Sequence, residues 1–339
     1  MSERWTAALV VAAVATTFLP NRHPRALEPA AAAKGPRVGL VFDVGGRGDK
    51  SFNDAAYEGV ARAHRELGVA MELLEPAQSE DREAAMRLFA ARGFDLVIAV
   101  GFIFSTDVDQ VARDFPDVRF ACIDYAPSVS GPPRNVAGLV FREEEGSYLV
   151  GAVAGLVTAT KHVGFVGGML NPVVRKFEVG YRAGVHAVCA ECVVHSAYAG
   201  TTPDAFKDPA KGKALAIAEM SEGADIVYHA AGATGHGVFE GAHEAGRFAI
   251  GVDSDQHDEM PDAILTSMVK RADVAVFETI RAVLDGRFSG GLRPLGLREG
   301  SIDYVHEGPH AALLPPDVIA RVEALREAII GGRIVVPRD

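Results

Sequence analysis

Short apolar runs alternate with amphipathic stretches along the chain from Arg37 onward. The run at 37–44 (RVGLVFDV) is rich in branched and aromatic side chains, which is typical of a short buried strand. In the stretch 52–67, apolar residues recur every three or four positions, which predicts a helix with one buried face. This pair of patterns is repeated along the chain. Strands that alternate with helices predict parallel sheets covered by helices on both faces.

The alternation occurs in two series of similar length, so we predict an α/β protein with two doubly wound parallel-sheet lobes. The expected lobes are an N-terminal one, 36–160 plus 265–296, and a C-terminal one, 161–264 plus 297–339. We expect the chain to cross between them near 159–162, 262–266 and 295–302. Several crossings form a hinge that lets two lobes close without sliding.

The first 35 residues have a different pattern. Residues 6–19 (TAALVVAAVATTFL) are almost entirely apolar, but this run is too short to span about 30 Å of hydrocarbon as a helix. The small residues at 30–33 (AAAA) offer a cleavage site. We therefore predict a signal peptide over 1–35 and export to the periplasm or to the outer face of the cytoplasmic membrane. A disordered tail or a short anchor is the alternative.

Composition and charge narrow the classes further. Of the 339 residues, 48% are hydrophobic, which is enough for two cores, and the formal net charge is −11. An acidic surface repels phosphate backbones, so no nucleic-acid partner is expected. Cys189 and Cys192 form one C-x-x-C pair, which is either a disulfide or two free thiols. The second C-x-x-C that would indicate zinc does not occur.

Residues that follow the expected strands are candidate ligand contacts, because ligands of open α/β sheets bind beyond the carboxyl ends of the strands. These positions are rich in glycine, aspartate and aromatic residues: Asp43-Val-Gly-Gly, Gly101-Phe-Ile-Phe, Asp124-Tyr, Gly167-Gly-Met, Tyr198-Ala-Gly, Ala231-Gly-Ala-Thr-Gly and Asp253-Ser-Asp. Carboxylates accept hydrogen bonds from hydroxyl or amine groups, and aromatic rings stack on flat ligands. A neutral polyhydroxylated or heteroaromatic ligand fits this set better than a phosphorylated one, and no cofactor is predicted.

The stretch 46–54 (GRGDKSFND) combines a helix start with candidate contacts. Asp49 or Ser51 is expected to cap the helix. Phe52 and Asn53 lie in its first turn and are expected to point across the crevice, although Phe52 packed in the core is the alternative. Phe102 and Phe104 follow the third expected strand and are expected to contribute to the pocket or only to the core.

Other patterns give weaker indications. Gly232-Ala-Thr-Gly-His-Gly237 has the spacing G-x-x-G-x-G instead of G-x-G-x-x-G, so a turn that brings backbone near a ligand is favoured over a phosphate loop. Asp43 with Asp253 and Asp255 allows a paired-carboxylate or cation site, as in a nucleoside hydrolase, but hydrogen bonds to sugar hydroxyls are favoured. No metal site is predicted from histidines that lie on different elements: His195, His229, His236 and His243.

A family resemblance is carried by specific stretches. The segment 38–60 (VGLVFDVGGRGDKSFNDAAYEGV) resembles the opening of the basic membrane protein family, also called the purine nucleoside receptor A-like family. Further matches follow in order: NVAGLVFREEEGSYLVGAVAGL, KFEVGYRAGV, YAG with FKDPAKGKALA, AGATGHGV, IGVDSDQ and LTSMVKRADVAV. The resemblance covers 37 to about 286. The family usually carries a lipoprotein cysteine after its signal, which this chain does not have.

The resemblance implies a type I periplasmic-binding-protein fold and a non-enzymatic role. The expected protein is a monomeric, extracytoplasmic solute-binding protein of an ABC importer, which delivers a nucleoside, with a purine favoured, to a membrane permease. The implied contacts are Phe52 and Phe177 stacking on the base, Asp43, Asn53 and Asp124 on its edge, Asp253 and Lys270 on the ribose, and Gly232 through its backbone. A nucleoside-processing hydrolase and a ligand sensor with the same fold are the alternatives.

Overall fold

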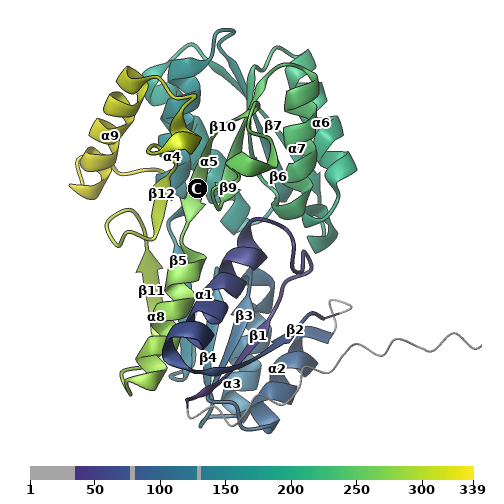
Figure 1. Ribbon diagram of the computed structural model, residues 1–339, viewed down its shortest axis with the longest axis vertical. Helices are drawn as coiled ribbons and strands as arrows, with labels where there is room; N and C mark the ends of the chain where they lie inside the picture. The colour runs from purple at the N-terminus through teal and green to yellow at the C-terminus, as the bar shows by residue number, and fades with distance from the viewer. Residues whose placement is uncertain (1–34, 77–80, 128–130) are drawn as a thin grey trace, which may run out of the picture. The chain divides into compact units, whose positions relative to one another are not determined.

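The apolar runs form two six-stranded sheets, one in each lobe, in a computed structural model that describes residues 35–76, 81–127 and 131–339 (Figure 1). The first sheet has the order β11-β5-β4-β3-β1-β2, and its paired strands run parallel. Its strands are β1 (Arg37–Val41), β2 (Ala70–Leu74), β3 (Leu96–Val100), β4 (Arg119–Ile123), β5 (Val136–Phe141) and β11 (Gly291–Leu295).

The second sheet has the order β12-β10-β9-β8-β6-β7. It is parallel except where β12 pairs antiparallel with β10. Its strands are β6 (His162–Met169), β7 (Val193–Gly200), β8 (Ile226–Ala230), β9 (Phe248–Asp253), β10 (Ile264–Lys270) and β12 (Ile302–Tyr304). Two parallel-dominated sheets confirm the predicted α/β class.

Helices cover both faces of each sheet because successive strand residues point to opposite sides. Leu40 joins the apolar cluster under one helical layer, whereas its neighbour Val41 joins the cluster that contains Phe89 on the other face. The helices of the first lobe are α1 (Phe52–Leu67), α2 (Asp81–Ala91), α3 (Ser105–Asp114) and α8 (Ala272–Leu284). Those of the second lobe are α4 (Glu143–Val157), α5 (Pro172–Val188), α6 (Pro209–Ser221), α7 (Gly235–Glu244) and α9 (Pro316–Ile330).

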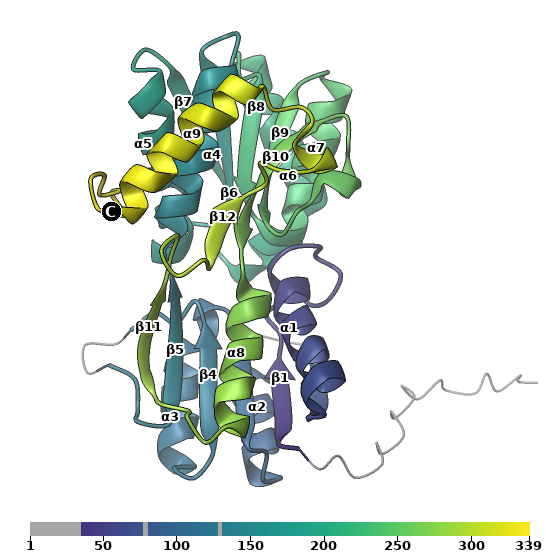
Figure 2. The same cartoon turned by 60° about the vertical axis from the view of Figure 1, so that its left-hand side comes forward.

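Two of the three expected crossings between the lobes are wrong. Helix α4 packs against α5, α9 and β10 of the second lobe, so the first crossing follows β5 at residue 142 and not at 159–162. Strand β10 belongs to the second sheet while α8 packs against α1 in the first lobe, so the next crossing is at residue 271 and not at 262–266. The third connects β11 with β12, within the expected segment (Figure 2).

The lobe boundaries expected at 160 and 265 shift for the same reason. Helix α4 is buried along most of its length, with Leu149 and Val153 fully covered, so its apolar pattern does not tell which sheet it covers. The first lobe therefore holds 35–141 and 272–295, and the second holds 143–270 and 302–339, as far as the chain is described.

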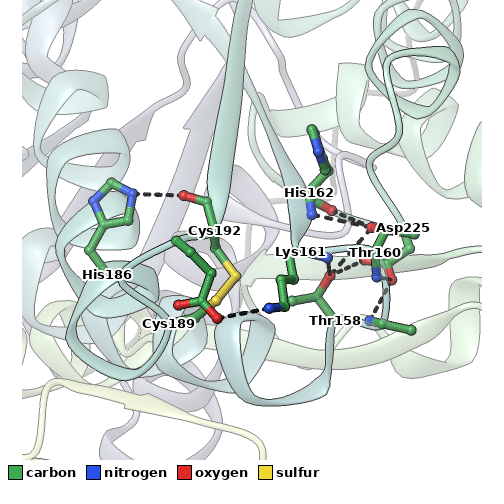
Figure 3. The surroundings of a disulfide bond; sticks show 10 residues. Thr158, Thr160, Lys161, His162, His186, Cys189, Cys192 and Asp225 are labelled. Atoms are coloured by element: carbon green, nitrogen blue, oxygen red, sulfur yellow. Dashed lines mark hydrogen bonds and ion pairs between the residues drawn. A yellow bond between two sulfur atoms is a disulfide. The ribbon is translucent and has the colours of Figure 1, made fainter.

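The segment after α4 is instead fixed inside the second lobe (Figure 3). The carboxylate of Asp225, which precedes β8, accepts hydrogen bonds from Thr158 Oγ1 at 2.6 Å, Ala159 N at 2.7 Å and Thr160 N at 3.0 Å. Three donors on one carboxylate hold this turn against the sheet and explain why the chain does not leave the lobe here.

A disulfide joins Cys189, at the end of α5, to Cys192, just before β7 (Figure 3). His186 Nε2 lies 3.1 Å from the Cys192 carbonyl oxygen, and Lys161 pairs with Glu191 at 2.9 Å. Of the two alternatives that the sequence left open for this pair, the structure has the disulfide. Cys122 is a free, buried cysteine of the first lobe.

Helices α4 and α5 pack with their backbones in contact. A Cβ added to Gly151 of α4 would collide with the carbonyl oxygen of Tyr181 on α5. In the opposite direction, a Cβ on Gly180 or Gly184 of α5 would collide with the carbonyl oxygens of Glu144 or Tyr148 on α4. The close approach therefore depends on glycine from both helices.

The predicted signal peptide and its cleavage site lie outside the described residues. Within the described part of the chain, no helix combines the length and apolar character that crossing a membrane requires.

Candidate functional site

One cavity between the lobes is lined by all eight residues that the family resemblance implies as ligand contacts. It encloses about 570 Å³ when the part open to solvent is included. The eight are Asp43, Phe52, Asn53 and Asp124 from the first lobe and Phe177, Gly232, Asp253 and Lys270 from the second. Other lining residues include Gly45, Asp49, Phe102, Val173, Val174, Phe206 and Val252.

Asp49 caps α1 and holds the neighbouring polar groups in place. Its carboxylate accepts backbone hydrogen bonds from Ser51, Asn53 and Asp54 at 2.9–3.1 Å. It also accepts a bond from the Asn53 side-chain nitrogen, and Asn53 Oδ1 accepts one from the Asp43 backbone N–H at 3.1 Å. The first turn of α1 therefore positions Asp43, and burial raises the pKa of the Asp43 carboxyl from 3.8 to about 6.

Ser51 was the other candidate for the helix cap, but its side chain bonds to the other lobe. Ser51 Oγ donates to Asp253 Oδ2 at 2.7 Å and makes no cap hydrogen bond. Gln256 Nε2 of the second lobe donates to the Lys50 carbonyl oxygen at 3.2 Å, and Ser254 Oγ donates to the Ser51 carbonyl oxygen. These bonds join the two lobes next to Asp253, which lines the cavity. This role could not be predicted from the sequence, because a serine before a helix has a sufficient local explanation as a cap.

Lys270 forms the centre of a buried charge network. Its ammonium lies 2.7 Å from Asp124 Oδ2 and 3.0 Å from Glu143 Oε1, and its side chain is 1% exposed. Lys176 also pairs with Glu143 and donates to the Phe141 carbonyl oxygen at 2.7 Å. Burial alone would lower the pKa of Lys270, but the surrounding carboxylates raise it. The lysine therefore stays charged, and it links strand ends of both lobes.

Aromatic rings from both lobes surround this ammonium. Its nitrogen lies 4.8 Å from the ring centre of Phe52 and 5.6 Å from that of Phe177, so these two centres are at most about 10 Å apart. Phe52 lines the cavity and also packs partly against the core. Phe102 lines the cavity too, whereas Phe104 is fully buried in the first lobe.

Phe206 is a cavity residue that the sequence analysis did not assign. It lies in a short 3-10 helix (Pro203–Phe206) after β7, and its ring packs where a Cβ on Gly168 would stand. Gly232 has φ +54°, and a Cβ there would lie 3.2 Å from the Phe206 carbonyl oxygen. The signal for Phe206 was its position near a strand end, within the stretch FKDPAKGKALA.

The glycine-rich stretch from Gly232 is a turn with packing roles. Added Cβ atoms would collide with the His229 ring at Gly235 and with the Pro209 carbonyl oxygen at Gly237. Close packing between elements therefore explains why glycine occupies positions 235 and 237. Of the three glycines, Gly232 is the one that lines the cavity.

The two carboxylates of the Asp253-Ser-Asp255 stretch lie in different places, one in the cavity and one outside it. Asp253 lines the cavity with its backbone at φ +65°, and Asp124 has a similar φ of +58°, an uncommon conformation for residues other than glycine. Asp255 Oδ2 instead contacts His310 Nδ1 at 2.7 Å, outside the cavity. The alternative of a site that contains Asp43, Asp253 and Asp255 together is therefore wrong.

Comparison with known proteins identifies the family. Residues 37–338 match the family described as ABC transporter substrate-binding protein, PnrA-like. Basic membrane protein A of Borreliella burgdorferi is 32% identical over 90% of this chain and 88% of its own length. An uncharacterized lipoprotein of Pyrococcus horikoshii is 36% identical over 80% of this chain and 69% of its own length.

The fold agrees with that assignment. The crystal structure of an ABC transporter solute-binding protein from Aeropyrum pernix is 32% identical to this chain, with a TM-score of 0.78, and the match covers 90% of this chain and 94% of that one. The expected type I-like binding-protein fold is thereby confirmed. This chain belongs to the PnrA-like family of ABC transporter substrate-binding proteins.

Proposed function

We propose that the protein binds a nucleoside, with a purine nucleoside favoured, between its lobes and delivers it to the permease of an ABC importer. The observation that carries this proposal is the cavity with Phe52 and Phe177 from opposite lobes and strand-end carboxylates around it. Flat aromatic faces suit a base, and carboxylates suit amino and hydroxyl groups.

Each part of a nucleoside has a partner in this proposal. Phe52 and Phe177 stack on the two faces of the base, while Phe206 covers part of the apolar wall. Asp43 and Asp124 accept hydrogen bonds from the base edge, and Asn53 acts mainly by fixing Asp43, since both ends of its amide already have partners. Asp253 and Lys270 contact the ribose, and the backbone of Gly232 approaches it closely.

The charge balance around the cavity favours a neutral ligand. The carboxyl groups of Asp43, Asp49, Asp124 and Asp253 line it, whereas Lys270 is the one cation among the described residues that line it, and Lys270 is already paired. A nucleotide would bring a phosphate into this field at an electrostatic cost. We therefore propose that the site accepts nucleosides and excludes nucleotides.

The same arrangement supports binding in preference to hydrolysis. Asp253 accepts a hydrogen bond from Ser51 across the lobes, and Asp255 faces away from the cavity. A hydrolase that activates water with two carboxylates needs them on the same ligand bond. We propose that the ligand is released unchanged.

Calorimetry would test the proposal with adenosine, guanosine, inosine and cytidine, with adenosine monophosphate as the matched charged ligand. We expect micromolar or tighter binding of at least one purine nucleoside and much weaker binding of the monophosphate. Absence of binding by all four nucleosides at millimolar concentration would refute the proposal. Release of free base during the titration would refute the non-catalytic part of it.

We further propose that the protein is exported and acts as a monomer on the outer side of the cytoplasmic membrane. The support is the apolar run at 6–19 with the small residues at 30–33, together with the membership of a transport-receptor family. Cell fractionation with N-terminal sequencing would test export. A mature protein that still begins at Met1 in the cytoplasm would refute it, and light scattering would give the oligomeric state.

A further inference from the structure

Two histidines and an aspartate meet on the second lobe, outside the nucleoside cavity. His257 and Asp258 lie in a short 3-10 helix (His257–Glu259) after β9, and His310 lies in another (Pro309–Ala311) before α9. Each residue offers one ligand atom, and these atoms all lie within 4.8 Å of one another. Imidazole nitrogen and carboxylate oxygen are ligands that Zn²⁺ takes in proteins.

The distances in this cluster fit a small metal ion. His310 Nε2 lies 3.4 Å from Asp258 Oδ1. In a tetrahedral zinc site with bonds of about 2.0–2.1 Å, neighbouring ligand atoms are about 3.3–3.4 Å apart. Two of the three ligand atoms therefore already have the spacing of one edge of the tetrahedron. The His257 nitrogen has to approach by about 1.4 Å at most to complete the set.

Asp255 contacts both histidines of the cluster and holds them in position. Its Oδ2 lies 2.7 Å from His310 Nδ1, and its Oδ1 accepts the His257 backbone N–H at 3.1 Å. A carboxylate on one ring nitrogen fixes the proton there and leaves the other nitrogen free, as in most histidine metal sites. The free Nε2 of His310 then faces the Asp258 carboxylate, an arrangement that a bridging cation stabilises.

A ring nitrogen of His257 lacks a hydrogen-bond partner among the described residues, which gives independent support. The ring stacks on His310 with ring centres 4.4 Å apart and an angle of 16° between the planes, so one ring has to turn before both nitrogens point at the same ion. Its Nδ1 is buried and has no hydrogen-bond partner. Buried polar atoms usually have a partner, so this nitrogen calls for one that the protein does not provide.

We propose that His257, Asp258 and His310 bind one divalent transition-metal ion such as Zn²⁺, with Asp255 holding His310 and water in the fourth position. Imidazole ligands select such ions over Mg²⁺ and Ca²⁺. The ion would join the segment after β9 to the segment before α9. Because Gln256, which bonds to Lys50 of the first lobe, immediately precedes His257, the metal would also fix the start of that contact.

Calorimetry on the full chain, without a histidine tag and after chelator treatment, would test the site with ZnCl₂ at pH 7.5. We expect one Zn²⁺ per chain, with binding at least tenfold weaker in Asp258→Asn and in His310→Asn. The matched controls are His243→Asn and Asp262→Asn, two exposed residues away from the cluster, and both should bind like the wild type. The Asp258 side chain is 84% exposed, so its replacement does not threaten folding.

Three results would overturn the proposal. One is the absence of stoichiometric Zn²⁺ binding at 100-fold molar excess, which would mean that a doubly protonated His310 simply bridges the two aspartates. Another is equal Zn²⁺ affinity in the wild type, Asp258→Asn and His310→Asn. The third is equal affinity for Mg²⁺ and Zn²⁺, which contradicts a site built on imidazole. Visible absorption of bound Co²⁺ would report the coordination geometry directly.

Discussion

Replacing Lys270 with methionine should strongly destabilise the protein. The substitution keeps the length of the side chain but leaves Asp124 without its cation and Glu143 with only Lys176. Glu143 is fully buried, and Asp124 is 7% exposed. Removing one partner from such a buried pair costs about 3–5 kcal/mol, because an uncompensated charge remains in a medium of low polarity.

The assay is urea unfolding followed by circular dichroism, with Lys213→Met as the matched control. Lys213 also contacts two carboxylates, Glu244 at 2.6 Å and Glu240 at 3.6 Å, but at the surface. Solvent screens those charges, so little change in the free energy of unfolding is expected. If both variants lose the same free energy, the buried network does not need its lysine and the reasoning is refuted.

Two further measurements separate charge from packing. Asp124→Asn in the Lys270→Met background should restore part of the lost stability, because it removes one of the unpaired charges. Lowering the pH should also reduce the deficit. Without Lys270, the pKa of Asp124 in the folded protein lies further above its unfolded value of about 3.9, so the deficit is largest at high pH and shrinks as the pH falls toward that value. A deficit caused by packing alone would not depend on pH.

Four other predictions concern the cavity and the disulfide. Phe52→Ala should weaken nucleoside binding by about 1–3 kcal/mol, the worth of one stacked ring; unchanged affinity in calorimetry would exclude stacking. Ser51→Ala removes a hydrogen bond to the charged Asp253 and should weaken binding about tenfold; small-angle scattering should then show more open molecules with ligand. Burial raises the pKa of Asp43 to about 6, so the affinity for the nucleoside should fall between pH 7.5 and 5.5 as this acceptor is protonated. The variant Asp43→Asn should abolish that pH dependence. The stability that Asp43 contributes to the folded protein, present at low pH, is lost as the pH rises through 6. Replacing Cys189 and Cys192 with serine should lower the free energy of unfolding by about 2 kcal/mol, as expected for so short a loop, with no change in affinity, and a larger loss of binding would show that the disulfide shapes the cavity.

Much of the fold follows from local patterns in the sequence. The run of branched apolar residues in β1 and the three- to four-residue spacing of apolar residues in α1 are clear patterns, and similar patterns are repeated along the chain. The crossings were harder to predict because they depend on which sheet an element joins. Helix α4 is buried along most of its length, and nothing in its own pattern distinguishes the first sheet from the second.

In the candidate site, too, local features could be predicted from the sequence and contacts between distant segments could not. Strand-end positions such as Asp43, Asp124 and Asp253 could be predicted, because parallel strands place their carboxyl ends at one edge. Contacts between the lobes could not. Ser51 has a plausible local role as a cap, and only the folded chain shows its bond to Asp253. His257 and His310 are similarly separated by about 50 residues, so no spacing rule connects them.

The backbone contact between α4 and α5 has a consequence for transport. Because carbonyl groups of each helix lie against glycines of the other, the two helices have little room to repack, and we expect them to move together. Phe177 lies on α5, and α4 begins directly after the first crossing. The thickness of the group held against Phe177 would therefore set the closure angle directly. A compound could then bind tightly yet hold the lobes at an angle that the permease does not accept, so affinity and delivery would be separable properties.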